Sequence, residues 1–291
     1  MLHPGLYEQV INNALTSELA KIPEARKSVA PIDKAEASKV LAQYLADVVQ
    51  KGLDNVLDNG GDISAQIRLT NQIVDLIQNT TKEADFAALG VDQRAEQLLA
   101  LLREADTRLA VGKTASDIER PETSIAQSSL FTGAVHEPQM YTELKKEIVS
   151  ADRIDMLVSF IKWSGLRLIM DELREFTQNG GELRIITTSY MGATDVKAIE
   201  ELRQLPNTQI KVSYNTKTTR LHAKAYIFYR NTGFTTAYVG SSNLSNAALT
   251  SGLEWNTKVT KRDLSETIDK IAATFEYYWN DREFEYYDEG Q

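Results

Sequence analysis

The sequence predicts an α/β domain in the C-terminal half of the chain and an all-α domain before it. After residue 138, short apolar runs alternate with amphipathic helical segments, as in βαβ units with a mostly parallel sheet. Residues 6 to about 110 instead place apolar side chains at helical spacing. A polar stretch, GKTASDIERPETSIAQSS, separates the two. We expect a helical domain over 1–112, a linker or arm over 113–137, an α/β domain over 138–282 and an acidic tail over 283–291.

The elements of the α/β domain follow from their apolar patterns. Continuous apolar runs are typical of strands buried on both faces, and glycines close the amphipathic segments. The stretch NTGF over 231–234 separates two strand-like runs and suits a hairpin. Strands are expected over 154–160, 182–190, 208–215, 223–230, 235–242 and 253–260, and helices over 138–151, 165–181, 195–205, 243–250 and 264–281. In the helical domain, DNGGDIS over 58–64 predicts a break followed by a helix N-cap.

Composition narrows the class of protein. The chain has no cysteine, which excludes disulfides, a thiol nucleophile and zinc–thiolate sites, and suits a cytoplasmic location. No apolar run is long enough to span a bilayer, so we expect no membrane contact. The net charge of −9 argues against nucleic-acid binding, but the acid lies in the N-terminal part and the tail. The stretch NTKTTRLHAK is locally basic and can guide an anionic ligand.

One of the three histidines, His222, stands two positions before Lys224 at the start of a predicted strand. Alternate residues of a strand share a face, so we expect imidazole and ammonium to point the same way, with Ala223 pointing into the core. An imidazole can attack phosphorus, an imidazolium can protonate a leaving oxygen, and an ammonium neutralises phosphate charge. The alternative is a strand edge with two polar side chains.

Two further polar elements follow this strand. In GSSN, Ser241, Ser242 and Asn243 stand where a helix is expected to begin, and helix N-termini bind anions. These side chains could donate to phosphate oxygens, or they could only cap the helix. Glu254, in SGLEWN, lies between apolar residues, where a carboxylate is costly without a partner. It could accept a hydrogen bond from His222 and fix its tautomer, or it could be an edge glutamate paired with a lysine.

Together, His-x-Lys, the GSxN turn and the later glutamate resemble the nuclease branch of the phospholipase D superfamily over roughly 138–280. IDMLVSFIKWSGLRLI, GSSNLSNAALTSGLEWN and the N-terminal GLYEQVINNAL resemble the front of certain bacterial superfamily 2 helicases. The resemblance implies a phospholipase D-like mixed sheet flanked by helices, and a helicase motor domain C-terminal to this chain. The chain itself has no Walker A glycine loop.

The resemblance also implies roles for the site residues. His222 attacks the phosphodiester and forms a phosphohistidine, Lys224 and Asn243 hold the non-bridging oxygens with help from Ser241, and Glu254 orients His222. No cofactor or metal is needed, because ammonium and amide groups supply the charge stabilisation. The superfamily's acid five positions after the lysine is Tyr229 here, a departure that the nuclease branch shares and that disfavours a lipase.

The implied mechanism requires two histidines, one as nucleophile and one as acid. This chain has one His-x-Lys motif, since His3 and His136 lack a lysine at that spacing. The resemblance therefore implies that two chains meet across a two-fold axis. We expect a homodimer with a composite active site.

Other residues are candidates for substrate binding. Lys162 and Trp163 follow the first buried strand, where loops of parallel sheets bind ligands, and the indole could stack on a base or pack on its own helix. Lys217 and Arg220 precede the motif and could contact phosphates or remain solvated. Tyr190 and Thr194 are weaker candidates after the second strand.

The sequence thus predicts a metal-independent phosphodiesterase that cleaves nucleic acid, with DNA favoured over RNA. A second hypothesis is a catalytically silent nucleic-acid-binding module of a helicase. A phospholipase or phosphatidyl transferase ranks lower, because the chain has no signal peptide and no acid at Tyr229.

Overall fold

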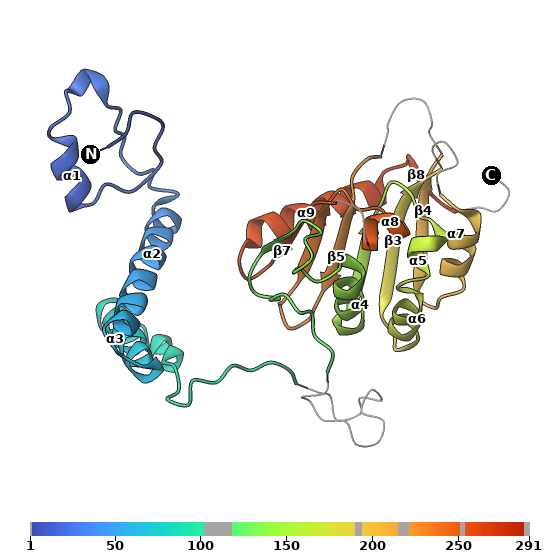
Figure 1. Ribbon diagram of the computed structural model, residues 1–291, viewed down its shortest axis with the longest axis horizontal. Coiled ribbons are helices and arrows are strands. Elements are labelled where there is room, and N and C mark those ends of the chain that lie inside the picture. Colours follow the sequence, from blue (N-terminus) through green and yellow to red (C-terminus); the bar gives the residue numbers. More distant parts are fainter. Residues whose placement is uncertain (1, 102–117, 190–193, 215–220, 251–253, 288–291) are drawn as a thin grey trace. The chain divides into compact units, whose positions relative to one another are not determined.

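The computed structural model describes residues 2–101, 118–189, 194–214, 221–250 and 254–287 (Figure 1). The chain forms two compact units, Met1–Ala100 and Leu101–Gln291, and each is described by itself. Lys217, Arg220 and Tyr190 lie outside the described residues.

The first unit is helical, as predicted. Asp62 caps its second long helix, because the carboxylate oxygen Oδ1 accepts from the backbone N–H of Ala65 at 2.9 Å, which confirms the predicted break and N-cap. Ile67 is the one large apolar residue of this unit that is buried among the described residues. The elements are α1 (Asn13–Leu19), η1 (Glu24–Arg26), α2 (Ala37–Asp58), α3 (Ile63–Thr81) and η2 (Ala84–Leu89).

The second unit contains an eight-stranded sheet with the order β1-β7-β6-β5-β2-β3-β4-β8 (Figure 1). Only the pairs β2–β3 and β3–β4 are parallel, and the other five pairs are antiparallel. The expectation of a mostly parallel sheet was wrong, because the strands after β4 are joined by a hairpin and short returns. The strands are β1 (Ser129–Phe131), β2 (Arg153–Leu157), β3 (Glu182–Thr188), β4 (Thr208–Ser213), β5 (Ala225–Tyr229), β6 (Thr236–Gly240), β7 (Asn256–Thr260) and β8 (Phe284–Tyr286).

Helices cover both faces of the sheet. Five helices pack on one face around Leu144, Met156 and Tyr226, whereas α9 packs on the other face around Ile227, Phe275 and Trp279. The helix expected over 165–181 is two helices, because the backbone of Ile169 leaves the helical region. The helices are α4 (Met140–Ser150), α5 (Trp163–Leu166), α6 (Met170–Gln178), α7 (Val196–Arg203), α8 (Asn246–Thr250) and α9 (Ser265–Asn280).

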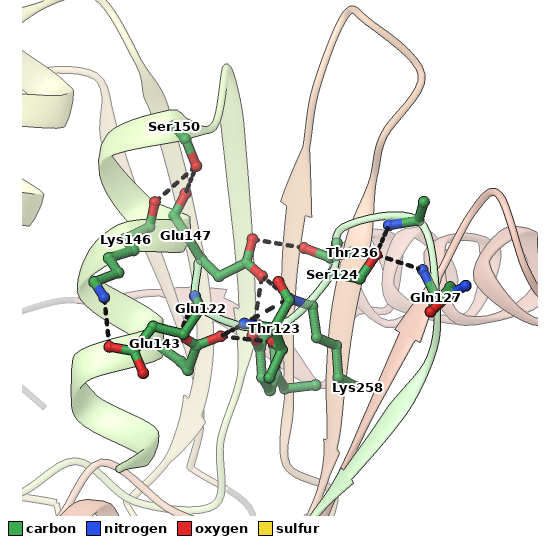
Figure 2. A network of polar contacts seen from close by, with 12 residues as sticks. Glu122, Thr123, Ser124, Gln127, Glu143, Lys146, Glu147, Ser150, Thr236 and Lys258 are labelled. Atoms are coloured by element: carbon green, nitrogen blue, oxygen red, sulfur yellow. Dashed lines mark hydrogen bonds and ion pairs between the residues drawn. The ribbon is translucent and has the colours of Figure 1, made fainter. Parts of the chain in front are cut away.

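The two edge strands lie in ranges for which the sequence indicated no strand. β1 lies within the expected arm, and a buried polar cluster holds the residues before it (Figure 2). The Glu143 carboxylate accepts from the backbone N–H groups of Glu122 and Thr123 at 2.6 and 3.2 Å. The Lys258 ammonium donates to the Thr123 hydroxyl and to Glu147, both at 2.9 Å. These contacts fasten Glu122 and Thr123, in the segment before β1, to α4 and β7.

Candidate active site

The candidate residues gather at one edge of the sheet. β5 runs antiparallel to β2, with Ala225 paired to Leu157, so the start of β5 meets the end of β2. β6 ends and β7 begins at the same edge, because Gly240 pairs with Asn256. Loops at the carboxyl ends of parallel strands are where ligands bind in α/β folds. The topology therefore brings the segments around His222, Asn243 and Glu254 to the end of β2.

His222 and Lys224 are in contact just before β5. The Lys224 ammonium lies 3.1 Å from Nδ1 of His222 and donates to its backbone carbonyl at 2.7 Å. His222 is exposed, whereas Lys224 is only 6% exposed. Burial lowers the pKa of Lys224, and the nearby Glu254 charge opposes this. Ala223 is exposed rather than in the core, because it lies before β5 begins at Ala225.

Burial raises the pKa of the Tyr226 phenol, and the nearby Glu254 carboxylate raises it further. The same carboxylate opposes the lowering of the Lys224 pKa by burial, so it lies close to both side chains. Within the described ranges, however, no hydrogen bond joins Glu254 to His222, because Nδ1 of the imidazole faces Lys224. The pairing of the Glu254 carboxylate with the His222 imidazole therefore stays a prediction.

Asn243 projects its amide toward the loop after β2. Its Oδ1 accepts from the backbone N–H of Phe160 at 3.2 Å, so the amide nitrogen is the end that can donate to a ligand. The side chain is 7% exposed. The expectation that Asn243 starts a helix was wrong, because α8 begins at Asn246 and the Ser245 hydroxyl accepts from the Ala248 N–H. Any anion contact therefore depends on the amide itself rather than on a helix terminus.

The two serines of the turn have different surroundings. Ser242 is fully buried, and its hydroxyl accepts from Nδ2 of Asn256 at 2.8 Å. That position corrects the expectation that Ser242 contacts substrate, because the hydroxyl is used inside the protein. Ser241 is exposed, and its hydroxyl accepts from the Trp255 N–H at 3.1 Å. Gly240 is required before them, since a Cβ there would lie 2.1 Å from the Trp255 carbonyl oxygen.

Lys162 and Trp163 are held by Asp195, a residue that the sequence reading missed. The Lys162 ammonium lies 3.1 Å from one carboxylate oxygen of Asp195, and the backbone N–H of Trp163 donates to the other at 2.8 Å. These contacts lower the pKa of Asp195, and the hydrogen bond from the backbone N–H of Trp163 is the main cause. The indole also lies under the Lys197 ammonium, 4.6 Å from the ring centre. Lys162 and Trp163 therefore frame the site, with the Lys162 ammonium paired to Asp195 in this structure.

The same loop is docked on the GSSN turn. The backbone N–H of Lys162 donates to the Leu244 carbonyl at 2.8 Å. Gly165 permits this approach, since a Cβ there would lie 2.4 Å from the Ser245 nitrogen. Thr194 is engaged in the fold as well, because its hydroxyl donates to the Thr188 carbonyl at 2.8 Å. These contacts fix the position of Asn243 relative to the end of β2.

Tyr229 ends β5, at the opposite end of that strand from the His222 segment. The Arg153 guanidinium lies over its ring, 3.9 Å from the centre, and burial raises the pKa of the phenol to about 12. Among the described residues, no group of three or more His, Asp or Glu side chains is arranged to hold a metal ion. None of the described helices combines the length and apolar character needed to cross a membrane.

Comparisons with known proteins found the following similarities. NucT from Helicobacter pylori is 22% identical with a TM-score of 0.40, over 52% of this chain and 94% of that chain. Nuc from Salmonella typhimurium, a phospholipase D family member, is 21% identical with a TM-score of 0.42, over 55% and 99% of the two chains. No curated protein sequence matches the chain. Residues 144–279 match the family described as "Cardiolipin synthase, PLD-like domain", and this part of the chain is therefore a phospholipase D-like domain.

Proposed function

We propose that the chain is a phosphodiesterase that cleaves nucleic acid through His222. The observation that carries the proposal is the state of Lys224. Lys224 is 6% exposed beside an exposed imidazole, yet among the described residues no carboxylate lies within ion-pairing distance of its ammonium. A buried cation costs free energy unless it is paired. A phosphate group at the imidazole would supply the missing negative charge.

The proposed reaction has two steps. Nε2 of His222 forms a bond to phosphorus while the bond from phosphorus to the leaving oxygen breaks, and an imidazolium from a second His222 protonates that oxygen. Water then attacks the phosphohistidine, gives its proton to the second imidazole and releases the first. Attack by Nε2 requires a proton on Nδ1. We therefore expect Lys224 to turn from Nδ1 to the phosphate and the Glu254 carboxylate to accept a hydrogen bond from the Nδ1–H group in its place.

Charge stabilisation in this proposal comes from protein groups. The Lys224 ammonium and the Asn243 amide nitrogen face the reacting phosphate, and Ser241 lies beside them, while Ser242 is left out because it is buried. No metal or cofactor takes part. Lys217 and Arg220 belong to the basic stretch before the motif and are proposed to contact the nucleic-acid backbone. We further propose DNA as the substrate, a homodimer, and a helicase motor domain that follows this chain.

Cleavage of DNA oligonucleotides in EDTA tests this proposal. The wild-type chain is expected to cut and to retain a ³²P label on protein in an acid-labile, base-stable form, which is the signature of a phosphohistidine. His222→Ala is expected to lose both activities, whereas His136→Ala, at another exposed histidine, is the matched control. Full cleavage by His222→Ala would refute the proposal.

Two alternatives have an observation in their favour. The lack of a Glu254–His222 hydrogen bond among the described residues suits a silent binding module, which would bind DNA without turnover under any condition. The family description names cardiolipin synthase, which suits phosphatidyl transfer. Release of product from phosphatidylglycerol vesicles, with no cleavage of DNA, would move the assignment to that chemistry.

A further inference from the structure

One large aromatic side chain beside the candidate site is left uncovered. Trp255 is 64% exposed, and among the residues that the structure describes no ring or cation lies over its indole. The two other tryptophans have such partners, because Lys197 lies 4.6 Å from the ring centre of Trp163, and Trp279 stacks on Phe275 at 5.9 Å. An indole usually gains stability from burial or from ring contacts, so an exposed one next to a site indicates a contact surface.

The backbone of Trp255 is fixed to the turn that carries the site. Its N–H donates to the Ser241 hydroxyl at 3.1 Å, and its carbonyl accepts from the Ser241 N–H, also at 3.1 Å. Gly240 allows this close approach, and its own N–H donates to the Lys224 carbonyl at 3.2 Å, which continues the pairing of β6 with β5. The indole is therefore anchored through its backbone while its ring is exposed, as a preorganised contact requires.

Trp255 lies within reach of a nucleotide strand bound at Lys224. The two residues belong to segments that are two strand spacings apart, because β6 lies between β5 and β7, and this corresponds to about 10 Å. About three nucleotides of a stacked strand cover that distance at a rise of about 3.4 Å each, and fewer cover it in an extended strand. Asn256 turns its side chain inward to Ser242, so the preceding Trp255 points outward.

The surroundings of the indole suit a base rather than a phosphate. Ser241 and Thr257, which are exposed on the same face, carry no charge, and the Glu254 carboxylate lies close to Lys224 instead. Phosphates are bound by lysine and arginine, whereas bases stack on aromatic faces whatever their identity. Bases within a duplex already stack on one another, so the indole requires an unpaired one.

We propose that Trp255 stacks on an unpaired base of the substrate near the phosphodiester that His222 attacks, an inference that rests on the proposed function. A strand that crosses this edge of the sheet places one phosphate at Lys224 and a nearby base on the indole. Trp255 then selects nucleic acid over other phosphodiesters, since a lipid head group such as phosphatidylglycerol has no ring to stack. It holds the strand and takes no part in the chemistry, so its loss should weaken binding.

Binding of two fluorescein-labelled oligomers of about 20 nucleotides tests this contact by fluorescence anisotropy. One is oligothymidylate, and the other is a base-less oligomer of tetrahydrofuran phosphates with the same charge. Each variant is made in the full chain carrying His222→Ala, so that the label stays on an intact strand. We expect Trp255→Ala to raise the Kd for oligothymidylate at least fivefold, as the loss of one stacked base does, and the Kd for the base-less oligomer less than twofold.

Two further variants complete the comparison. Trp255→Phe should restore most of the affinity for oligothymidylate, because a phenyl ring also offers a flat face to a base. Tyr286→Ala is the matched control, since Tyr286 is 58% exposed on β8, the edge strand farthest from β7 in the sheet (Figure 1). It should bind both oligomers as the parent chain does.

The outcomes separate this inference from the proposed function. Equal Kd values for oligothymidylate in Trp255→Ala and Tyr286→Ala would overturn the stacking contact, even if the chain carrying His222 cleaves DNA in EDTA. An equal rise of the Kd for both oligomers in Trp255→Ala would overturn it as well, because a lost phosphate contact or a disturbed fold would then account for the effect. If only oligothymidylate binding weakens and the chain carrying His222 cleaves no DNA, the contact stands and the proposed function fails. A chain that binds neither oligomer overturns both.

Discussion

Lys258 provides a direct test of how the buried polar cluster holds the second unit together. Lys258 and Glu147 are both fully buried, and the ammonium donates to Glu147 and to the hydroxyl of Thr123 (Figure 2). The substitution Lys258→Met keeps most of the alkyl volume and removes the charge. It also removes the link between β7 and the segment before β1.

The expected loss in the free energy of unfolding follows from the charged groups that remain around position 258. The variant keeps two buried carboxylates, Glu143 and Glu147, and one guanidinium, Arg230, which donates to Glu147 at 2.6 Å. Removing one partner of a buried ion pair costs about 3–5 kcal/mol, because an uncompensated charge stays in the interior. Arg230 and Thr236 still donate to Glu147, so we expect the lower end of that range, about 3 kcal/mol.

The loss should depend on pH in a defined direction. Burial raises the pKa of Glu147, but Arg230 and Lys258 outweigh it, so the folded pKa lies below the ordinary value. A carboxyl with a depressed folded pKa contributes stability above its unfolded pKa of about 4.3, and this is lost as pH falls through the folded pKa. Removing Lys258 raises the folded pKa. The difference in stability between the wild-type chain and Lys258→Met is therefore largest near pH 7 and becomes smaller in acid.

Urea unfolding followed by tryptophan fluorescence measures this loss. All three tryptophans, Trp163, Trp255 and Trp279, lie in the second unit, so the signal reports on that unit alone. Lys261→Met is the matched control, because Lys261 pairs with Asp269 at the surface, where ion pairs contribute about 1 kcal/mol or less. If Lys258→Met loses no more stability at pH 7 than Lys261→Met, the reasoning is wrong.

Three further predictions concern other parts of the chain. Gly240→Ala should destabilise the second unit by about 1–3 kcal/mol in the same assay, because its Cβ would meet the backbone carbonyl of Trp255, and an unchanged midpoint would contradict the tight approach. Asp195→Ala should cost about 1 kcal/mol and alter Trp163 fluorescence, since the backbone N–H of Trp163 loses its acceptor, and unchanged spectra would count against this contact. The fragment 1–100, with Ile67 as its buried apolar residue among those described, should melt without a cooperative transition by circular dichroism.

The central strands could be predicted because the apolar composition of each strand is visible in its own residues. The run IDMLVSF is apolar apart from Asp155 and Ser159, and such a run is typical of a strand buried on both faces. β1 and β8 have three residues each, and their place depends on partners far away in the sequence. Lys258 and Glu143 hold the segment before β1 from positions that no local pattern connects to it. The direction of pairing is likewise a property of connections rather than of single strands.

The site was predictable to the extent that spacing determines proximity. The two-residue interval between His222 and Lys224 brings them into contact, although β5 begins only at Ala225. The roles of Lys162 and Ser242 could not be read in the same way. Each is occupied by a partner distant in sequence, Asp195 for the lysine and Asn256 for the serine. The type of a residue does not show whether its polar group is already hydrogen-bonded or ion-paired within the fold.

Two lysines of the second unit, Lys224 and Lys258, are buried among the described residues, and their partners distinguish the site from the scaffold. Lys258 is surrounded by Glu147, Glu143 and the Thr123 hydroxyl, so its charge is balanced within the fold. Lys224 has His222 as its hydrogen-bond partner among the described residues, and burial lowers its pKa. A fold can retain such a buried cation where the surrounding structure fixes its position and a bound ligand supplies the opposite charge. An anion at His222 should therefore raise the pKa of Lys224, and amine-selective labelling that became slower at fixed pH when a phosphodiester bound would show it.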